Sequence, residues 1–472
     1  MASNEDSEWE VLGTVLVIGG GGREHALAQK LAESPQVSRV LVSPGNGGTA
    51  MGHESISNIP LNLDDFGAVL DFVKTKGISL VVIGPEQHLA SGLGDFLIQG
   101  GAACFGPTAA AARLETSKAF SKDFFARHGL RTARYETFTD FEAAKKYVMG
   151  LDYRVVVKCS GLAAGKGVLL PESTEETVAA LKQTMVDKAF GSAGDEVVVE
   201  EFLEGEEASL LAFCDGTRSV GMPPAQDHKR ALDGDQGLNT GGMGAYAPTP
   251  ALTGDALEEA LGMIQTTVTE MGKEGHPYTG ILYAGFILTK DGPSFLEYNC
   301  RFGDPETEVL LPLLSGDLYK ILLSCTQGKL DSSDVTWHGG AAATVVAAAP
   351  GYPEKYPKGM DIEGSLPCME KGADGEEWGG GFVYHAGTAL KEGGGIVTSG
   401  GRVLTVTGRG PDLRSALSIA YSRLSRVKFE GMHFRTDIGW RALALSSEIV
   451  PDVEPAPAAA AASESTGGKA RG

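Results

Sequence analysis

The amino-acid sequence predicts a multidomain protein of the α/β and α+β classes, with a parallel sheet in its N-terminal part and a β-rich C-terminal part. Apolar, strand-like runs alternate with helix-like segments from Val15 onward, which is typical of a parallel sheet with helices on both faces. From about Ala341 short β-like segments dominate instead. The 472 residues are enough for roughly three domains.

The first region is expected to alternate strands with helices. We expect strands at 15–18, 40–43 and 80–83, and helices at about 23–33 and 66–76. Ligands of open α/β sheets bind at the carboxyl ends of the strands, so the loops that follow these three strands are candidate binding loops.

The second and third regions are richer in strands. After an expected helix over 116–128, we expect strands at 154–158, 196–201, 209–214, 282–289 and 294–298. The third region should contain strands at 342–348, 381–384 and 402–408 and a helix over 412–427. We place the boundaries of the three regions at 13–115, 116–336 and 337–445, between an acidic leader (1–12) and an alanine-rich tail (446–472) that we expect to be disordered.

The composition argues against several classes of protein. No apolar run approaches the roughly 20 residues that a membrane helix needs. The net charge of −21 disfavours a nucleic-acid partner. If the substrates are themselves anionic, a divalent cation or a local cluster of basic residues must offset that charge.

The cysteines and the first residues bear on the compartment. The six cysteines are scattered and form no Cys-x-x-Cys pair, which argues against structural zinc and fits a reducing compartment. The acidic start resembles neither a secretory signal nor a basic transit peptide. We therefore expect a cytoplasmic protein, with a plastid location left open.

The most informative run is 295–308, FLEYNCRFGDPETE. It begins as a strand, on which Glu297, Asn299 and Arg301 share one face at period two. Carboxylate and amide oxygens suit a hard cation, and a fixed guanidinium suits a phosphoryl group or a carboxylate. The alternative, a polar strand edge, explains Glu-x-Asn alone but not the added arginine and acidic turn. Cys300 should face the opposite side and belong to the core.

Three loops of the first region are candidate anion sites. A strand runs into Gly19–Gly22 and Arg23, where bare backbone and a helix N-terminus favour an anion. The residue pattern breaks the dinucleotide fingerprint because no glycine stands at the third position, which disfavours a nicotinamide dehydrogenase. The loops that contain Asn46 and Glu86 follow the next strands. A tight turn without a ligand is the alternative.

Further candidates lie in the second region. Lys158 ends a strand before a glycine loop that contains Lys166, an arrangement suited to covering a triphosphate, although a flexible surface hairpin fits as well. This loop lacks the Walker A spacing. The acidic run that includes 200–207 could bind an adenine and a ribose, or it could form a solvated turn. The run 239–246 offers bare amides beside the basic side chains of 228–230, and His25, His228 and His385 lack metal-ligand spacing.

These segments, in this order, resemble the phosphoribosylamine–glycine ligases, an ATP-grasp family of purine biosynthesis. The resemblance runs from about Val15 to Ala442 and is carried by GGREHAL, PGNGGTA, FGPTAAAARLETSKAF, GLAAGKGV, EEFLEGEEAS, QDHKR, NTGGMGAY, EYNCRFGDPETE, YHAGT, GGRVL and DIGWRAL. It implies a Rossmann-like N-terminal domain, a central ATP-grasp domain with a mobile lid at about 135–203, and a small β-rich C-terminal domain. The implied reaction is the second step of de novo purine synthesis, in which ATP, glycine and 5-phosphoribosylamine give glycinamide ribonucleotide, ADP and phosphate through a glycyl phosphate.

The resemblance also implies site residues. Arg301 and Lys158 would be catalytic, and Glu297 and Asn299 would bind Mg²⁺ or Mn²⁺. ATP would be bound by Lys118, Lys158, Lys166, Glu200, Glu201, Phe202, Leu203 and one of Glu206 or Glu207, for which we choose Glu207. The other substrates would be bound by Gly20, Gly21, Gly22, Arg23, Asn46, Glu86, Asn239, Thr240, Gly241, Gly242, Met243 and Arg301.

The sequence departs from the family pattern at two places. His88 stands where the family commonly has a second proline, and Ser160 stands where it commonly has an aspartate. Two alternatives stay open: another ATP-grasp ligase or carboxylase with a different acid, and a nucleotide-sensing module without turnover. We expect small-molecule substrates only, no nucleic acid, no membrane, and a monomer or weak dimer.

Overall fold

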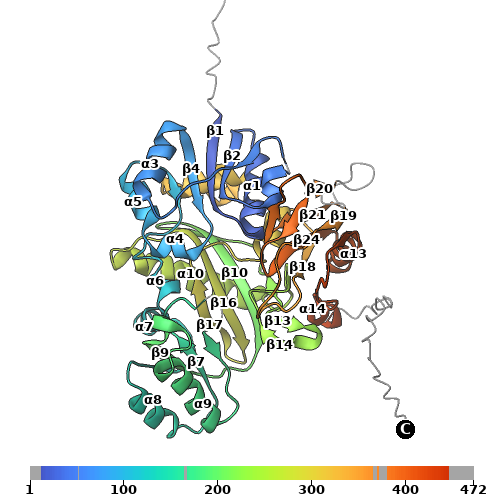
Figure 1. The fold of residues 1–472 in the computed structure, drawn as a ribbon. Coiled ribbons are helices and arrows are strands. Elements are labelled where there is room, and N and C mark those ends of the chain that lie inside the picture. Colours follow the sequence, from blue (N-terminus) through green and yellow to red (C-terminus); the bar gives the residue numbers. More distant parts are fainter. Residues whose placement is uncertain (1–11, 52, 164–166, 365–368, 371–379, 446–472) are drawn as a thin grey trace, which may run out of the picture.

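The computed structural model describes residues 12–51, 53–163, 167–364, 369–370 and 380–445 (Figure 1). Its N-terminal part is a five-stranded sheet in the order β3-β2-β1-β4-β5, and every neighbouring pair is parallel. The strands are β1 (Gly13–Gly19), β2 (Val37–Pro44), β3 (Ile56–Asn58), β4 (Ile78–Ile83) and β5 (Cys104–Phe105). The helices are α1 (Gly22–Ala32), α2 (Gly47–Met51), α3 (Phe66–Thr75), α4 (Glu86–Ala90) and α5 (Leu93–Gln99).

The alternation of side chains along β1 explains why helices cover both faces of this sheet. Val15 and Val17 belong to the same core as Leu27 of α1. Leu16 and Ile18 point the other way and share a second core with α3 and α5. A strand that is apolar on both faces is buried on both, as parallel sheets require. The expected parallel sheet is therefore confirmed.

A second, smaller sheet lies at the opposite end of the molecule in Figure 1. Its four strands are antiparallel and are ordered β6-β9-β7-β8. They are β6 (Tyr135–Phe138), β7 (Val155–Cys159), β8 (Val168–Leu169) and β9 (Val197–Glu201), and they pack on α8 (Phe141–Val148), α9 (Thr174–Leu181) and the η1 turn (Lys182–Val186). The η2 turn (Gly191–Gly194) precedes β9. This unit has a core of its own, built on Val157, Val199 and Leu181.

The central sheet joins these two parts. It is antiparallel in the order β11-β10-β16-β17. Its strands are β10 (Glu206–Asp215), β11 (Ser219–Gly221), β16 (Thr279–Thr289) and β17 (Gly292–Asn299). Around it lie α6 (Arg113–Thr116), α7 (Lys118–Arg127), α10 (Gly254–Lys273), α11 (Thr307–Leu313), α12 (Leu318–Thr326), the hairpin of β13 (Arg230–Leu232) and β14 (Gln236–Asn239), and the turns η3 (Asp233–Asp235) and η4 (Ser332–Asp334).

The C-terminal sheet has six strands in the order β12-β15-β18-β24-β21-β20. They are β12 (Gln226–Asp227), β15 (Gly244–Ala247), β18 (Ala341–Ala348), β20 (Met369–Glu370), β21 (Gly381–His385) and β24 (Arg402–Gly410). Short pairs are formed by β19 (Glu363–Gly364) with β25 (Val427–Lys428) and by β22 (Thr388–Leu390) with β23 (Ile396–Thr398), and the helices are α13 (Leu413–Leu424) and α14 (Trp440–Leu445). Helix α13 lies so close to β24 that a Cβ at Gly408 would sit 2.1 Å from the Ala416 carbonyl oxygen.

Two features differ from or add to the expectation. The helix expected over 116–128 is broken at Ser117, which is extended and accepts a hydrogen bond from the Phe120 N–H (3.2 Å) as the N-cap of α7. In addition, β15 lies within the central region by sequence but pairs with β18, with Ala245 opposite Thr344. Two strands of the C-terminal sheet, β12 and β15, therefore come from the central region of the sequence.

Two further observations concern composition. Five cysteines (Cys104, Cys159, Cys214, Cys300 and Cys325) are buried and free, and Cys368 lies outside the described residues. None of the helices in the described part of the chain combines the length and apolarity that crossing a bilayer requires.

Candidate functional site

Four charged side chains meet between the small sheet and the central sheet. Lys158 is the next-to-last residue of β7, Glu200 lies on β9, and Lys118 and Lys122 lie one helical turn apart on α7. The Nζ atoms of Lys122 and Lys158 lie 2.8 and 3.0 Å from the two carboxylate oxygens of Glu200. Burial alone would raise the pKa of Glu200, but Lys158 and Lys122 lower it overall. The cleft thus holds a buried cluster of two ammonium groups on one carboxylate.

Strand β17 forms the other wall of this cleft. A small hollow is lined by Leu114, Lys118, Ser121, Lys122, Phe125, Glu200, Leu296, Glu297 and Tyr298. Lys158 also donates to the Leu296 carbonyl oxygen (3.1 Å), which ties β7 to β17. The structure therefore brings Lys118, Lys158, Glu200 and Glu297, all predicted from the sequence, to one place.

Glu297 and Asn299 on β17, and Arg301 two residues after its end, continue along this wall. The Glu297 carboxylate lies 3.9 Å from Lys118 Nζ, and Arg301 donates to Asn299 Oδ1 (3.3 Å). Arg301 also pairs with Glu86 (3.0 Å) and Glu115 (3.3 Å), which fix its guanidinium. Burial alone would raise the pKa of Glu297, but Lys118 and other nearby cations lower it to about 2. Glu297 is therefore ionised at neutral pH.

Glu297 and Asn299 fit a hard cation that is shared with phosphate. Their oxygens are of the type that Mg²⁺ and Mn²⁺ prefer, and Gly285, opposite Glu297 in β16, leaves the strand pair free of a side chain there. Among the described residues no group of three or more His, Cys, Asp or Glu could hold a metal ion. A cation at these two residues would therefore depend on phosphate oxygens and water for its other ligands.

The residues expected to bind adenine and ribose follow the end of β9. Glu201 pairs with Arg134 (2.8 Å), and the guanidinium of Arg154 lies over the Phe202 ring at 4.2 Å. Glu207, on β10, is paired with Lys229 (2.7 Å). Leu203 lies in the short connection between β9 and β10. Lys166 falls outside the described residues.

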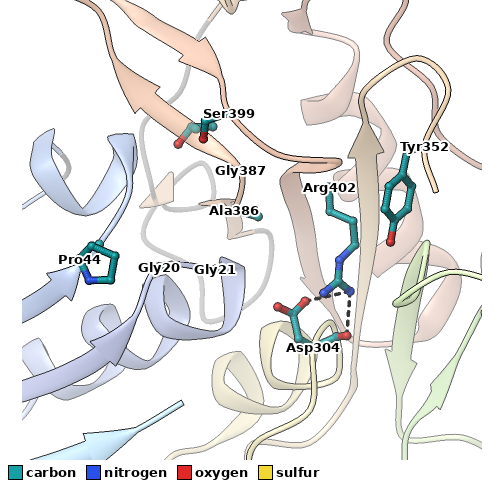
Figure 2. Close-up of a pocket in the computed structure, with 11 residues that line it drawn as sticks. Gly20, Gly21, Pro44, Asp304, Tyr352, Ala386, Gly387, Ser399 and Arg402 are labelled. Carbon is teal, nitrogen blue, oxygen red and sulfur yellow. Dashed lines mark hydrogen bonds and ion pairs between the residues drawn. The ribbon is translucent and has the colours of Figure 1, made fainter. Parts of the chain in front are cut away.

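The glycine loops of the N-terminal sheet open into a separate cavity of about 380 Å³ (Figure 2). Its walls come from the N-terminal sheet, from the turn after β17 and from the C-terminal part of the chain. The lining residues are Gly20, Gly21, Pro44, Gly45, Asp304, Tyr352, Ala386, Gly387, Thr388, Ser399 and Arg402. Two of the predicted substrate residues, Gly20 and Gly21, therefore line a cavity large enough for a small phosphorylated ligand.

Other predicted substrate residues support these walls instead of lining them. Arg23 is buried, contacts Glu24 and donates to the Phe302 carbonyl oxygen (3.2 Å). Asn46 donates to the carbonyl oxygens of Gly20 (3.1 Å) and His385 (2.7 Å) and so joins the N-terminal loop to the C-terminal part. Gly22 begins α1, directly after the lining residue Gly21. Glu86 lies beside Arg301.

The segment from Asn239 to Met243 lies between the hairpin of β13 and β14 and the strand β15. Thr240 donates to the Lys229 carbonyl oxygen (2.9 Å) and accepts from the Gly242 N–H (3.0 Å). The Gly241 carbonyl oxygen accepts from Arg402, and Met243 is buried. This segment therefore connects the cavity to the basic run that ends in Arg230.

The three carboxylates that follow β17 point to different places: one faces the cavity and two are buried in the core. Asp304 faces the cavity and pairs with Arg402 (3.1 Å). Glu306 is buried and accepts from the Tyr283 hydroxyl (2.6 Å). Glu308 is fully buried without a hydrogen-bond partner among the described residues, and burial and Asp304 raise its pKa well above the usual range. Only the first of these three carboxylates is open to a ligand.

Sequence reasoning missed several of these residues. Lys122 could have been found because it lies four positions after Lys118, on the same face of the helix. Arg402 lies within GGRVL and Asp304 within the acidic turn, but neither motif assigned a role to its charged residue. Tyr352 carried no sequence signal.

The fold and the cleft define an ATP-grasp protein, since a family model of an ATP-grasp domain matches residues 116–307. The biotin carboxylase domain of the 2-oxoglutarate carboxylase of Hydrogenobacter thermophilus shares the fold, with a TM-score of 0.67 at 18% identity over 89% of this chain and 91% of that one. The expected fold class is therefore confirmed.

The chain belongs to the phosphoribosylglycinamide synthetase family. The models of its N domain, its ATP-grasp (A) domain and its C domain match residues 13–115, 116–307 and 342–441. A phosphoribosylamine–glycine ligase of Vibrio vulnificus (strain CMCP6) is 46% identical over 91% of this chain and 98% of its own length. The solved phosphoribosylamine–glycine ligase of Thermotoga maritima has a TM-score of 0.77 at 35% identity, covering 90% of this chain and all of that one.

The chain also matches longer relatives. The trifunctional purine biosynthetic protein adenosine-3 of Gallus gallus is 52% identical over 92% of this chain, which spans 43% of that protein.

Proposed function

We propose that this chain ligates glycine to 5-phosphoribosylamine at the expense of ATP, giving glycinamide ribonucleotide, ADP and phosphate. The observation that carries the proposal is the meeting of Lys118, Lys158, Glu200 and Glu297 in one cleft. The family membership and the names of the relatives support the choice of substrates.

In this proposal the cleft binds ATP. Lys118 and Lys158 offer positive charge to its phosphates, and the end of β9 contacts the adenine. Both carboxylate oxygens of Glu200 are paired with lysines, so its part in this proposal is to hold the Lys158 ammonium in place beside the phosphates. The Glu207 carboxylate, which is paired with Lys229, also accepts hydrogen bonds from the ribose hydroxyls.

Glu297 and Asn299 would hold Mg²⁺ or Mn²⁺, which supplies charge neutralisation to the triphosphate. The glycine carboxylate attacks the γ-phosphorus, which forms a glycyl phosphate and releases ADP. Arg301, fixed by Glu86 and Glu115, steadies the charge on the transferred group. The amine of phosphoribosylamine then attacks the glycyl carbonyl carbon, phosphate leaves, and the nitrogen loses a proton.

Substrate-dependent release of ADP tests this function. The full chain should release ADP from ATP only when glycine is present, and mass spectrometry should find glycinamide ribonucleotide when phosphoribosylamine is added. A panel of other carboxylic acids distinguishes a related ligase or carboxylase, and nucleotide affinity without turnover identifies a sensor. The cytoplasmic location, the monomer or weak dimer, and the absence of nucleic-acid and membrane partners stay predictions of the sequence.

A further inference from the structure

Arg402, to which the sequence motifs assigned no role, is the first residue of β24 and reaches the cavity of the glycine loops (Figure 2). Its Nη1 atom donates to the carbonyl oxygens of Gly241 (2.6 Å) and Asp304 (2.8 Å) and lies 3.1 Å from the Asp304 carboxylate. One nitrogen of the guanidinium is therefore anchored on two separate loops.

The other nitrogens of Arg402 have no such anchor. Within the described part of the chain, no acceptor is seen for its Nε and Nη2 atoms, and 22% of the side chain is exposed. A guanidinium held at one corner presents the rest of its planar fork, and such forks match the oxygens of phosphate or carboxylate. The side chain is thus oriented before any ligand arrives.

The opposite wall is bare backbone. A Cβ at Gly20 would lie 2.6 Å from the Gly45 carbonyl oxygen, and a Cβ at Gly387 would lie 2.4 Å from Gly400, so these close approaches require glycine. Helix α1, of 11 residues, begins at Gly22 next to this wall, and its N-terminal end carries a partial positive charge. Glu24, in the first turn of α1, caps this end by accepting from the Gly21 N–H (2.6 Å), so the side-chain positive charge at the cavity comes from Arg402.

Asp304 gives the same cavity an acceptor. Its Oδ2 atom lies within 3.3 Å of the Cβ position of Gly21, on the glycine-loop side, while Oδ1 faces Arg402. Carboxylate oxygens accept hydrogen bonds from hydroxyl groups. A cationic fork next to an ionisable acceptor suits a ligand that carries both a phosphate and hydroxyl groups.

We propose that Arg402 recognises the 5-phosphate of phosphoribosylamine, with Asp304 facing the ribose hydroxyls. This inference rests on the proposed function, and it deepens it by assigning the specificity for the second substrate to a residue of the C-terminal sheet. Arg402 is then a substrate-binding residue, and the cavity is incomplete without the C-terminal part of the chain.

Binding of stable fragments to the full chain tests the inference without turnover. Ribose 5-phosphate, ribose and inorganic phosphate are titrated calorimetrically into the parent chain and into Arg402→Gln. We expect Arg402→Gln to lower the affinity for ribose 5-phosphate by at least about tenfold, because the change removes hydrogen bonds to a charged group. Affinity for ATP should stay within about twofold. Arg409→Gln, on the same strand but outside the cavity lining, is the matched control and should bind ribose 5-phosphate like the parent.

A second pair of variants covers the case in which Arg402→Gln does not fold. Ala386 lines the cavity, and Ala386→Asp and Ala386→Asn differ in charge but scarcely in size. Ala386→Asp should lower the affinity for ribose 5-phosphate at least about fivefold more than Ala386→Asn does, because the aspartate repels an anion.

The results separate this inference from the proposed function. Unchanged ribose 5-phosphate affinity in Arg402→Gln, or equal effects of the two Ala386 variants, overturns it. Inorganic phosphate that binds as tightly as ribose 5-phosphate overturns the role of Asp304. If ribose 5-phosphate binds through Arg402 but the parent chain releases no ADP with glycine, the proposed function fails and the phosphate site stands.

Discussion

The Nζ atom of Lys158 lies 3.0 Å from the Glu200 carboxylate, and both side chains are almost completely buried. Lys122 approaches the other carboxylate oxygen at 2.8 Å and donates to the Thr132 hydroxyl (2.6 Å). Burial lowers the pKa of Lys122 to about 8, although Glu200 opposes this shift. Glu200 is therefore the group that makes two buried ammonium ions tolerable in the cleft.

Replacing Glu200 by alanine should destabilise the protein. The change leaves two buried cations without their counter-ion, and breaking a buried pair in this way costs about 3–5 kcal/mol. Glu200→Gln keeps the shape and should cost less than Glu200→Ala. Urea denaturation followed by circular dichroism measures the loss.

The neighbouring residue provides the control for this prediction. Glu201 pairs with Arg134, whose side chain is 63% exposed, and exposed pairs contribute at most about 1 kcal/mol. If Glu200→Ala were no more destabilising than Glu201→Ala, the buried cluster would not have the importance assigned to it.

Glu297→Gln should reduce the rate of ADP formation by at least roughly a hundredfold, because it removes the charged ligand proposed for the metal while keeping the side-chain shape. Steady-state rates at saturating Mg²⁺ measure the effect. Binding of ATP without divalent metal should change little. Glu259→Gln, which alters a half-exposed pair with Arg131, should leave the rate unchanged. A normal rate in Glu297→Gln would place the metal elsewhere.

Local patterns in the sequence predicted much of the fold and part of the site. The apolar run Val15–Ile18 predicted a doubly covered strand, because a strand buried on both faces must be apolar at every position. The period of two placed Glu297, Asn299 and Arg301 on one face of a strand, and the structure puts them along one wall. These predictions depend only on neighbours in the chain.

The rest depends on contacts between distant residues, which periodicity does not encode. Nothing in Gly244–Ala247 indicates that this strand pairs with β18, about a hundred residues later, because register is set by packing in the whole fold. Arg402 likewise meets Asp304 only after the C-terminal sheet has folded against the turn after β17. Sequence patterns therefore singled out residues that meet in the proposed nucleotide cleft, but they missed the far wall of the second cavity.

Acidification should destabilise the protein through its buried histidines. Burial, reinforced by Arg435, lowers the pKa of His228 to about 4, and burial lowers that of His385 to about 4 as well. An unfolded histidine has a pKa of about 6.5, so between about pH 6.5 and 4 the unfolded chain binds protons that the folded chain does not. Stability is therefore complete above about pH 6.5 and is lost as the pH falls toward 4, by at most roughly 3 kcal/mol for each histidine.

His228→Gln should make this pH dependence shallower. His228 Nε2 accepts from the Gly439 N–H (2.9 Å), and the glutamine carbonyl oxygen offers an uncharged acceptor that does not titrate. Urea unfolding at several pH values between 4.5 and 7 measures the slope for the parent and the variant. Equal slopes would mean that His228 titrates normally in the folded state.

Ser160 should be replaceable by aspartate but not by alanine. Its hydroxyl accepts from the Ala119 N–H (3.2 Å) and its carbonyl oxygen accepts from the Lys118 N–H (2.9 Å), so it joins the end of β7 to the start of α7. Ser160→Ala loses the hydroxyl that accepts from the Ala119 N–H and should cost about 1 kcal/mol, with a raised KM for ATP because the start of α7, which carries Lys118, is held less firmly. Ser160→Asp keeps an acceptor and adds a negative charge where the helix dipole favours one, so its stability should match or exceed that of the parent. Thermal unfolding and the KM for ATP measure both effects, and an aspartate variant less stable than the alanine variant would contradict this role of Ser160.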